Sequence, residues 1–364
     1  MLTIKKNDNI FIKKIHEAKQ EGKMVYILGA ANGGKRIANG LKYFNIDIDA
    51  FIVDEEYYTP GEKMQGVEVL NIETVDLSKA IIIISVANYP KLSELKKRAY
   101  IIDEDIQSLS MAASPPFDHT FISKHFMEFN DLYEKLADRK SRQVMNAYLN
   151  QKITGRFCEL KGLWNKLQYF DGDFYDLSKV SCIVDCGAFD GDSFLSFCSA
   201  YNDLTGNDFV GDAYLLDPDT DNQKKIMNNC RCCVANVMQL QVGAWHEQGT
   251  MSFQTDFRFG TAGKITLSNV GNVIVKVDKI DNILQGNRVD FIKMDIEGAE
   301  LNALRGAKES IIKYHPVLAV CAYHKREDLL ELPRYISSLC SKYKFYIRAY
   351  GGPYSIELVL FAVA

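Results

Sequence analysis

The stretch that most constrains the fold lies at residues 180–194 and reads VSCIVDCGAFDGDSF. An apolar run ends at Asp185, and an apolar helical pattern begins at Phe194. Between them lies a turn rich in small residues, which contains Gly187, Ala188, Phe189, Asp190 and Gly191. A buried strand that ends in a glycine turn and opens a helix is how α/β proteins present backbone N–H groups to a small ligand. The stretch therefore predicts an α/β sheet with a ligand site at the end of this strand.

The acid at the end of this strand bears on the charge of the ligand. Asp185 would repel a pyrophosphate, because like charges at short range disfavour each other. It suits a cationic ligand better, and S-adenosylmethionine carries both an ammonium and a sulfonium group. Taken alone, the turn would also fit an ordinary strand–turn–helix without a ligand.

Further apolar runs with the length of buried strands follow, separated by helical patterns. They lie at 212–216, 237–244, 289–294 and 316–322. Two last runs, 343–350 and 357–364, flank a Gly-Gly-Pro turn and are expected to pair antiparallel. The pattern predicts a mostly parallel sheet whose last strand is antiparallel, with an inserted hairpin near residues 251–277.

The carboxyl ends of parallel strands share one edge of a sheet, where α/β proteins bind their ligands. Asp217 ends the second strand and is expected to accept hydrogen bonds from both hydroxyls of an adenosine ribose, with Pro218 beside it. Gly243 and Ala244 end the third strand, where an adenine would lie. Asp219 suits the N-cap of the next helix.

The fourth core strand runs into Asp295-Ile296-Glu297-Gly298-Ala299-Glu300. Asp295 and Glu297 follow the core directly, which favours a functional role for both. Glu297 and Glu300 would also serve as first-turn acids that favour the helix dipole. An aromatic segment at 157–174 is expected to pack in the core, with a lid over a cofactor as the alternative.

A second glycine turn, GAANGGK, starts at Gly29 and has the spacing G-x-G-x-x-G with Ala31 in the second position. Asp54 closes the next strand, where dinucleotide folds hold a ribose hydroxyl. The pattern predicts a Rossmann-like domain with nucleotide-binding candidates Gly29, Ala30, Gly33, Gly34 and Asp54. Because Ala31 narrows the approach to a pyrophosphate, a docking or dimerisation domain without a ligand is an equal alternative.

The chain of 364 residues is long enough for two domains. We expect a nucleotide-binding domain at 1–113, a helical connector at 114–178 and a second α/β domain at 179–364. The boundary is placed at Ser114-Pro115-Pro116.

The net charge of −4, without a long basic run, argues against nucleic-acid binding. No apolar run approaches 18 residues, so no membrane span is expected. The nine scattered cysteines favour a reducing cytoplasm over a disulfide framework. A homodimer is expected only from unused sheet edges.

Several ordered motifs resemble the FkbM family of methyltransferases. They are VDCGAFDGDSF, LLDPD, VGAW, KMDIEGAELNALRGA and AYHKREDLLELP, spread from about residue 136 to the end. Part of the first domain resembles, in GAANGGKRIA, FIVDEE and GVEVL, the nucleotide-sugar-binding domain of bacterial sugar acetyltransferases. The first resemblance implies a class I S-adenosylmethionine-dependent O-methyltransferase acting on sugars, in which the glycine turn binds the cofactor. Asp217 stands where the family more often has Glu.

The resemblance also implies roles for His324, which matches the family's YHK, and for Asp295 and Glu297, which match its DxEG motif. His324 has a suitable pKa for a general base that accepts a proton from a sugar hydroxyl. Asp295 or Glu297 could orient this histidine, act as the base instead, or hold a divalent metal, although no metal is indicated.

The function expected from these features is O-methylation of a sugar in polysaccharide or glycoconjugate biosynthesis. The acceptor would be a nucleotide-linked or lipid-linked glycan held by the first domain. The alternative is an inactive nucleotide-sugar-binding scaffold. A nicotinamide-dependent enzyme is disfavoured by Ala31.

Overall fold

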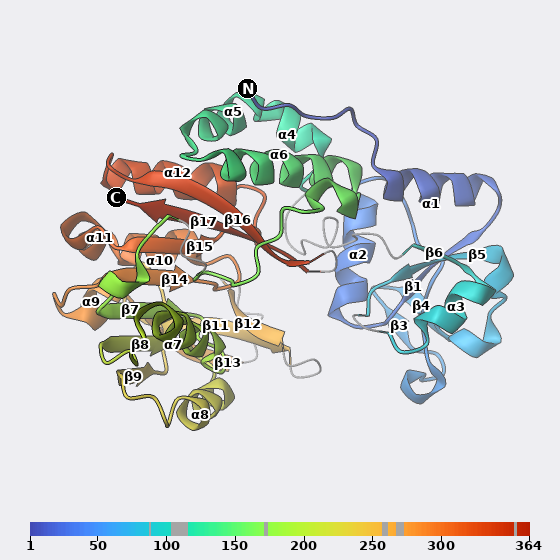
Figure 1. The fold of residues 1–364 in the computed structure, drawn as a ribbon. Helices are drawn as coiled ribbons and strands as arrows, with labels where there is room; N and C mark the ends of the chain where they lie inside the picture. The colour runs from blue at the N-terminus through green and yellow to red at the C-terminus, as the bar shows by residue number, and fades with distance from the viewer. Residues whose placement is uncertain (87–88, 103–115, 171–173, 257–260, 267–272, 353–354) are drawn as a thin grey trace. The chain divides into compact units, whose positions relative to one another are not determined.

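The computed structural model describes residues 1–364 except 87–88, 103–115, 171–173, 257–260, 267–272 and 353–354 (Figure 1). The chain divides into two compact units, each built on its own main sheet. Unit 1 comprises Met1–Met127, Met145–Gly162 and Pro353–Ser355, and unit 2 comprises Glu128–Val144, Leu163–Gly352 and Ile356–Ala364. The boundary predicted at residues 113–114 lies outside the described residues, and the predicted connector is divided between the units.

Unit 1 has a six-stranded sheet in the order β3-β4-β2-β1-β5-β6. Its strands are β1 (Met24–Leu28), β2 (Ala50–Val53), β3 (Lys63–Met64), β4 (Val67–Asn71), β5 (Ala80–Ile84) and β6 (Tyr100–Ile102). β1 lies between β2 and β5 and pairs with both in parallel, whereas β3 pairs with β4 antiparallel. The direction of strand order reverses beside β1, as in Rossmann-like folds.

Alternation along β1 explains the two faces of this sheet. Val25 and Ile27 pack on one face with α1 (Ile10–Gln20) and α2 (Asn32–Lys42). The intervening Tyr26 and Leu28 pack on the other face, together with Leu95 of α3 (Leu92–Arg98). Both faces are covered, which is why the strands read as continuous apolar runs.

Unit 2 has a seven-stranded sheet in the order β16-β17-β15-β14-β7-β8-β9. Its strands are β7 (Cys182–Cys186), β8 (Asp212–Leu216), β9 (Asn236–Leu240), β14 (Phe291–Met294), β15 (Val317–Cys321), β16 (Lys344–Gly352) and β17 (Ser355–Val363). The five core strands pair in parallel, and β17 pairs with β15 antiparallel. The predicted fold class, two Rossmann-like domains with a mostly parallel second sheet, is confirmed.

A smaller sheet of unit 2 has the order β10-β13-β11-β12. It consists of β10 (Gly243–Ala244), β11 (Gly249–Asp256), β12 (Thr261–Thr266) and β13 (Val273–Asp278). The predicted third strand, 237–244, is therefore wrong at its end: β9 stops at Leu240, and Gly243 and Ala244 join β13. Gln241 and Val242 separate the two pieces, which lets the chain leave one sheet for the other.

The helices of unit 2 cover the main sheet. They are α7 (Asp192–Thr205), α8 (Thr220–Asn229), α9 (Ile280–Leu284), α10 (Glu300–Gly306), α11 (Lys308–Tyr314) and α12 (Asp328–Leu339). Phe194 and Phe197 of α7 pack with Phe291 of β14 in a core cluster of this unit. Short 3-10 helices η1 to η5 lie at Glu55–Tyr57, Ile72–Thr74, Leu77–Lys79, Phe157–Leu160 and Leu177–Lys179.

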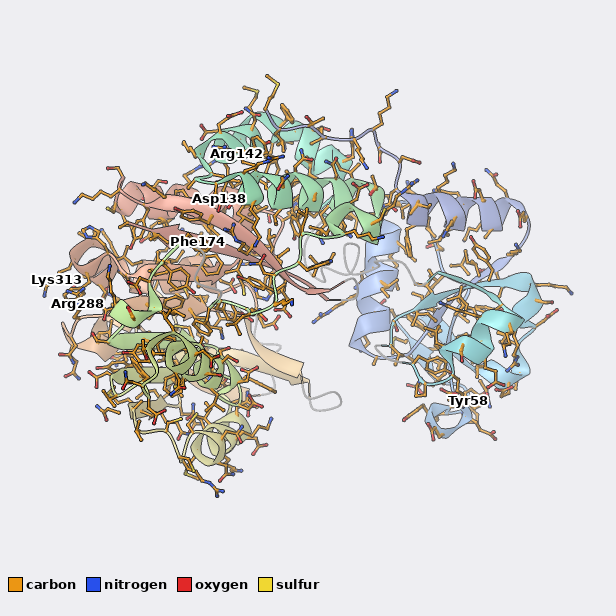
Figure 2. All side chains as sticks on the ribbon, in the orientation of Figure 1. Tyr58, Asp138, Arg142, Phe174, Arg288 and Lys313 are labelled. Atoms are coloured by element: carbon orange, nitrogen blue, oxygen red, sulfur yellow. The ribbon has the colours of Figure 1, made fainter. Side chains whose placement is uncertain are left out.

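The connecting segment is helical, with α4 (His119–Lys124), α5 (Phe126–Lys135) and α6 (Arg139–Thr154). Arg348 of β16, which is 1% exposed, donates to Asp138 Oδ2 at 2.7 Å and to Ser141 Oγ at 2.9 Å. Its guanidinium lies 4.7 Å from the ring centroid of Phe174. Figure 2 labels Asp138 and Phe174 among the side chains of this unit. These contacts fasten the start of α6 to the main sheet of unit 2.

Across the described ranges, no helix combines the length and the apolar character that a membrane crossing requires.

Candidate functional site

The glycine turn of unit 2 lies at the carboxyl end of β7, in the middle of the main sheet. Gly187 has φ 78°, and a Cβ at this position would collide with the carbonyl oxygen of Asp295. The turn therefore needs glycine both for its left-handed backbone and for its close approach to the end of β14. Phe189 adopts φ 49°, which is uncommon for a residue with a side chain and points to a constrained turn. Gly191 is the N-cap of α7.

Asp217 lies at the carboxyl end of β8, next to this turn. Its Oδ2 accepts a hydrogen bond from Phe189 N at 3.0 Å, and its Oδ1 accepts one from Asp219 N at 2.9 Å. Burial raises the pKa of this carboxyl to about 6, although these hydrogen bonds oppose the shift. Asp219 caps α8 as predicted, by accepting from Asp221 N and Asn222 N. The structure thus brings together the glycine turn and Asp217, the two features that the sequence predicted to bind the same cofactor.

Asp185 faces the protein interior. It is 1% exposed, and Lys293 of β14, 2% exposed, places its Nζ 2.9 Å from Asp185 Oδ1. The same Nζ donates to Gly187 O at 2.8 Å and lies over the ring of Tyr169. The cation that pairs with Asp185 is therefore Lys293, and not a ligand as the sequence suggested. The same lysine holds the glycine turn through its hydrogen bond to Gly187 O. Sequence reasoning missed Lys293. The feature that could have revealed it is a lysine within a buried strand, two residues before Asp295.

The other cofactor candidates lie near the same edge. Asn229 Nδ2 donates to Asp190 O at 2.9 Å, which ties the turn to the end of α8. Pro218 follows Asp217 before α8 begins. Gly243 and Ala244 are buried in the smaller sheet, and Trp245 packs with Ile296 and Ala299 beneath the loop after β14.

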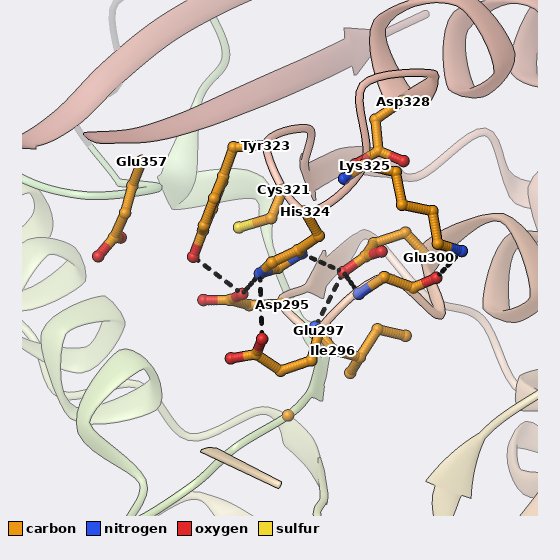
Figure 3. A network of polar contacts seen from close by, with 12 residues as sticks. Asp295, Ile296, Glu297, Glu300, Cys321, Tyr323, His324, Lys325, Asp328 and Glu357 are labelled. Atoms are coloured by element: carbon orange, nitrogen blue, oxygen red, sulfur yellow. Dashed lines mark hydrogen bonds and ion pairs between the residues drawn. The ribbon is translucent and has the colours of Figure 1, made fainter. Parts of the chain in front are cut away.

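Asp295 lies at the carboxyl end of β14 and is surrounded by hydrogen-bond donors (Figure 3). Its Oδ2 accepts from Tyr169 OH at 3.0 Å, and its Oδ1 accepts from Tyr323 OH at 3.4 Å. Burial favours the neutral acid, but Lys293, His324 and Tyr169 together hold its pKa below the usual value. Asp295 is therefore an ionised, fixed carboxylate. Tyr169 comes from the aromatic segment that the sequence assigned to the core, where it is buried as expected but also contacts the site.

His324 follows β15 and lies among three carboxylates. Its Nδ1 is 2.8 Å from Glu300 Oε1, while its Nε2 is 3.4 Å from Asp295 Oδ1 and 3.9 Å from Glu297 Oε2. Burial favours the neutral ring, but the carboxylates of Glu300, Asp295 and Glu297 outweigh it and raise the pKa of His324 to about 10. Among the described residues, no hydrogen bond reaches Nε2. The three catalytic candidates thus come together, with Nε2 between Asp295 and Glu297.

Glu300 is the member of this cluster whose role the sequence did not reveal. It is 1% exposed, and its Oε1 accepts from Ile296 N at 3.1 Å and from Gly298 N at 3.2 Å, in addition to its contact with His324. Glu297 between them has φ 54°, so the loop is held in a conformation that costs about 1–3 kcal/mol. Lys325 Nζ donates to Gly298 O from the opposite side. Glu300 does lie in the first turn of α10, as expected, but its side chain also binds His324 and two amides of the loop after β14.

The described residues contain no group of three or more His, Cys, Asp or Glu side chains placed to hold a metal ion. All nine cysteines are unpaired, and burial raises the pKa of Cys198 and Cys230 to about 12, which makes these two thiols unreactive.

The candidate nucleotide site of unit 1 lies at the switch point of its own sheet. Gly29 and Ala30 lie in the turn between β1 and α2, whereas Gly33 and Gly34 lie in the first turn of α2, where a Cβ at Gly34 would collide with the carbonyl of Gly29. Asp54 follows β2 and accepts from Tyr89 OH at 3.1 Å and Lys91 Nζ at 2.8 Å. Because Tyr89 and Lys91 follow β5, these contacts bridge the two strands that flank β1.

Comparison with known proteins adds a family to this geometry. Residues 185–345 match the family described as the methyltransferase FkbM domain. The crystal structure of Methyltransferase FkbM from Methylobacillus flagellatus KT is similar, with 21% identity and a TM-score of 0.66, over 99% of this chain and 94% of that one. An O-methyltransferase family protein from Burkholderia thailandensis shares 9% identity over 66% of this chain and 69% of that one, with a TM-score of 0.29. No curated protein matches the chain.

Proposed function

Residues 185–345 carry the methyltransferase FkbM domain and the chain is a methyltransferase, and from this premise we propose that it is an S-adenosylmethionine-dependent O-methyltransferase. The observation that carries the proposal is the joining of the glycine turn, Asp217 and Asp295 at one sheet edge. Phe189 N donates to Asp217, and Gly187 packs against the carbonyl of Asp295. A ligand seated on the turn would therefore meet all three.

The residues at this edge fit S-adenosylmethionine in shape and in charge. Gly187 and Phe189 both have a left-handed backbone, which turns the chain at the end of β7 beside Asp217. Asp217 would accept from the ribose hydroxyls, and Ala188, Asp190, Gly191 and Pro218 would line the same edge, with Gly243 and Ala244 behind the adenine. The ionised Asp295 would favour the cationic end. When bound there, the cofactor supplies a methyl group activated by its sulfonium.

The proposed acceptor is a sugar hydroxyl of a polysaccharide or glycoconjugate precursor, and His324 is the proposed general base. Its Nε2 takes the proton that the hydroxyl loses as the acceptor oxygen gains the methyl group. Asp295 and Glu297 flank Nε2 and would favour the imidazolium that forms. The histidine must first be neutral, so transfer is expected to be faster in alkaline solution, given its raised pKa.

Unit 1 is proposed to hold a nucleotide-linked or lipid-linked form of that sugar. Asp54 has the position of a ribose acceptor after β2, and Lys91, which contacts it, could instead neutralise a phosphate. A cytoplasmic protein is proposed from the nine unpaired cysteines. Homodimerisation is retained as a proposal that rests only on the sheet edges.

The first test is calorimetric titration with S-adenosylhomocysteine, followed by nucleotide-sugars in the same cell. We expect one-to-one binding that Asp217→Ala abolishes and that Asp221→Ala, which alters an exposed acid on α8, leaves intact. Failure of the wild-type protein to bind the homocysteine product would refute the proposed cofactor. Substitution of His324 by Gln should leave this binding unchanged and lower transfer by about 10²–10⁴-fold.

A further inference from the structure

Glu300 has no part in the proposed transfer, yet it lies at the centre of the site. It enters from the first turn of α10, whereas His324 comes from the segment after β15. The two side chains are almost fully buried, with 1% of the Glu300 side chain and 8% of the His324 side chain exposed. A buried carboxylate needs partners for its charge, and Glu300 Oε1 has three of them, the amides of Ile296 and Gly298 and the ring of His324.

The geometry divides the two nitrogens of the imidazole. Nδ1 is 2.8 Å from Glu300 Oε1, a normal hydrogen-bond distance, so this nitrogen carries a hydrogen. No hydrogen bond reaches Nε2 from the described residues, and Nε2 is directed toward Asp295 and Glu297. An acid on one nitrogen and the reacting group on the other is the arrangement by which hydrolases orient a histidine base.

We propose that Glu300 is a positioning residue that fixes His324 as the Nδ1–H tautomer and leaves Nε2 to accept the proton of the acceptor hydroxyl. This inference rests on the proposed methyl transfer to a hydroxyl. Since Glu300 also accepts from Ile296 N and Gly298 N, it holds the loop that carries Asp295 and Glu297 in register with the histidine. Glu300 thus fixes both the orientation of His324 and the conformation of the loop that carries Asp295 and Glu297.

Other charged and titratable groups also face His324. Asp295 and Glu297 add negative charge from the loop after β14. The pKa of Asp328 in α12 is raised to about 8, mainly by burial and also by the charge of Glu300. Tyr323 lies beside the imidazole, with 4.1 Å between the ring centroids. Tyr169, Cys321 and Lys293 act on Asp295, and Lys325 N donates to Asp328. Glu300 differs from Asp295 and Glu297 in touching Nδ1, so its removal should change the tautomer as well as the pKa.

The test is a titration of His324 by NMR in the full chain, with the histidine ring carbons and nitrogens labelled. The chain has six histidines, and His324→Gln identifies the signal. In the wild-type protein we expect a pKa near 10 and, above it, the nitrogen shifts of the Nδ1–H tautomer. Glu300→Gln keeps an oxygen for the two loop amides but removes the charge. It should lower the pKa by about one to three units and mix the tautomers.

The controls separate this inference from a structural role and from the proposed function. Glu309→Gln, the same change at an exposed position of α11, should leave the titration of His324 unchanged. If Glu300→Gln shifts neither the pKa nor the tautomer, the positioning role is wrong, whatever its effect on stability. S-adenosylhomocysteine binding in the same samples judges the proposed function separately, because the titration of His324 requires no ligand.

Discussion

The buried ion pair of Lys293 with Asp185 offers the sharpest test of how the cofactor turn is held. The two side chains are 2% and 1% exposed, and the Nζ–Oδ1 distance is 2.9 Å. We predict that Lys293→Met strongly destabilises unit 2. The substitution removes the only charge that directly contacts Asp185 among the described ion pairs, and with it the hydrogen bond to Gly187 O.

The magnitude follows from the burial of both partners. Removing one member of a buried pair leaves an uncompensated charge and costs about 3–5 kcal/mol. A unit of this size loses about 2–4 °C in Tm for each kcal/mol, so Tm should fall by about 6–20 °C. Replacing both residues by apolar ones of similar size should restore most of the loss, because no charge then remains in the interior.

Unfolding can be followed specifically in unit 2, because both tryptophans of the chain, Trp164 and Trp245, belong to it. Urea unfolding monitored by tryptophan fluorescence should be compared for wild type, Lys293→Met and the pair Asp185→Val with Lys293→Met. The surface control is Lys224→Met, which removes an ion pair with Asp221 of similar length, 2.7 Å, but on the exposed face of α8. Its free energy of unfolding should hardly change.

Two results would refute this reasoning. Equal stability of Lys293→Met and Lys224→Met would show that the interior solvates Asp185 without the lysine. A double variant less stable than Lys293→Met would show that the pair contributes more than the avoidance of a lone charge. S-adenosylhomocysteine affinity of the double variant then reports separately on the support of the turn by the lysine.

Three further predictions concern titration and the unit 1 site. The pKa of His324 is raised from about 6.5 to about 10, so its ion pairs contribute stability that is fully present below about pH 6.5 and is lost as the pH rises toward 10; His324→Gln should flatten that fall in urea unfolding between pH 7 and 10. The pKa of Asp217 is raised to about 6 by burial, so calorimetric binding of S-adenosylhomocysteine should weaken as the pH falls below 6, and a constant affinity down to pH 4.5 would exclude Asp217 as the ribose acceptor. Asp54→Ala should weaken nucleotide-sugar binding by about tenfold or more, as expected when a charged hydrogen-bond acceptor is lost, whereas an unchanged affinity would place the nucleotide elsewhere.

Much of the fold could be predicted because each core strand of unit 2 is an apolar run of about the observed length. The antiparallel β17 also followed from its sequence, since a Gly-Gly-Pro turn leaves no room for a crossover helix. The end of the third strand was predicted wrongly. The apolar run continues through Ala244, and nothing in it signals that Gly243 pairs with Val277 in another sheet.

For the site, the sequence determined which residues stand at strand ends, because chain order and strand period place Asp185, Asp217, Asp295 and His324 at the carboxyl ends of their strands. Which of these side chains face one another was decided only by tertiary structure. Asp185 is paired with Lys293, and Glu300 contacts His324, which lies 24 residues further along the chain. Such pairs depend on how neighbouring strands and helices pack, and on the need of a buried charge for a partner. Local sequence patterns do not contain this information.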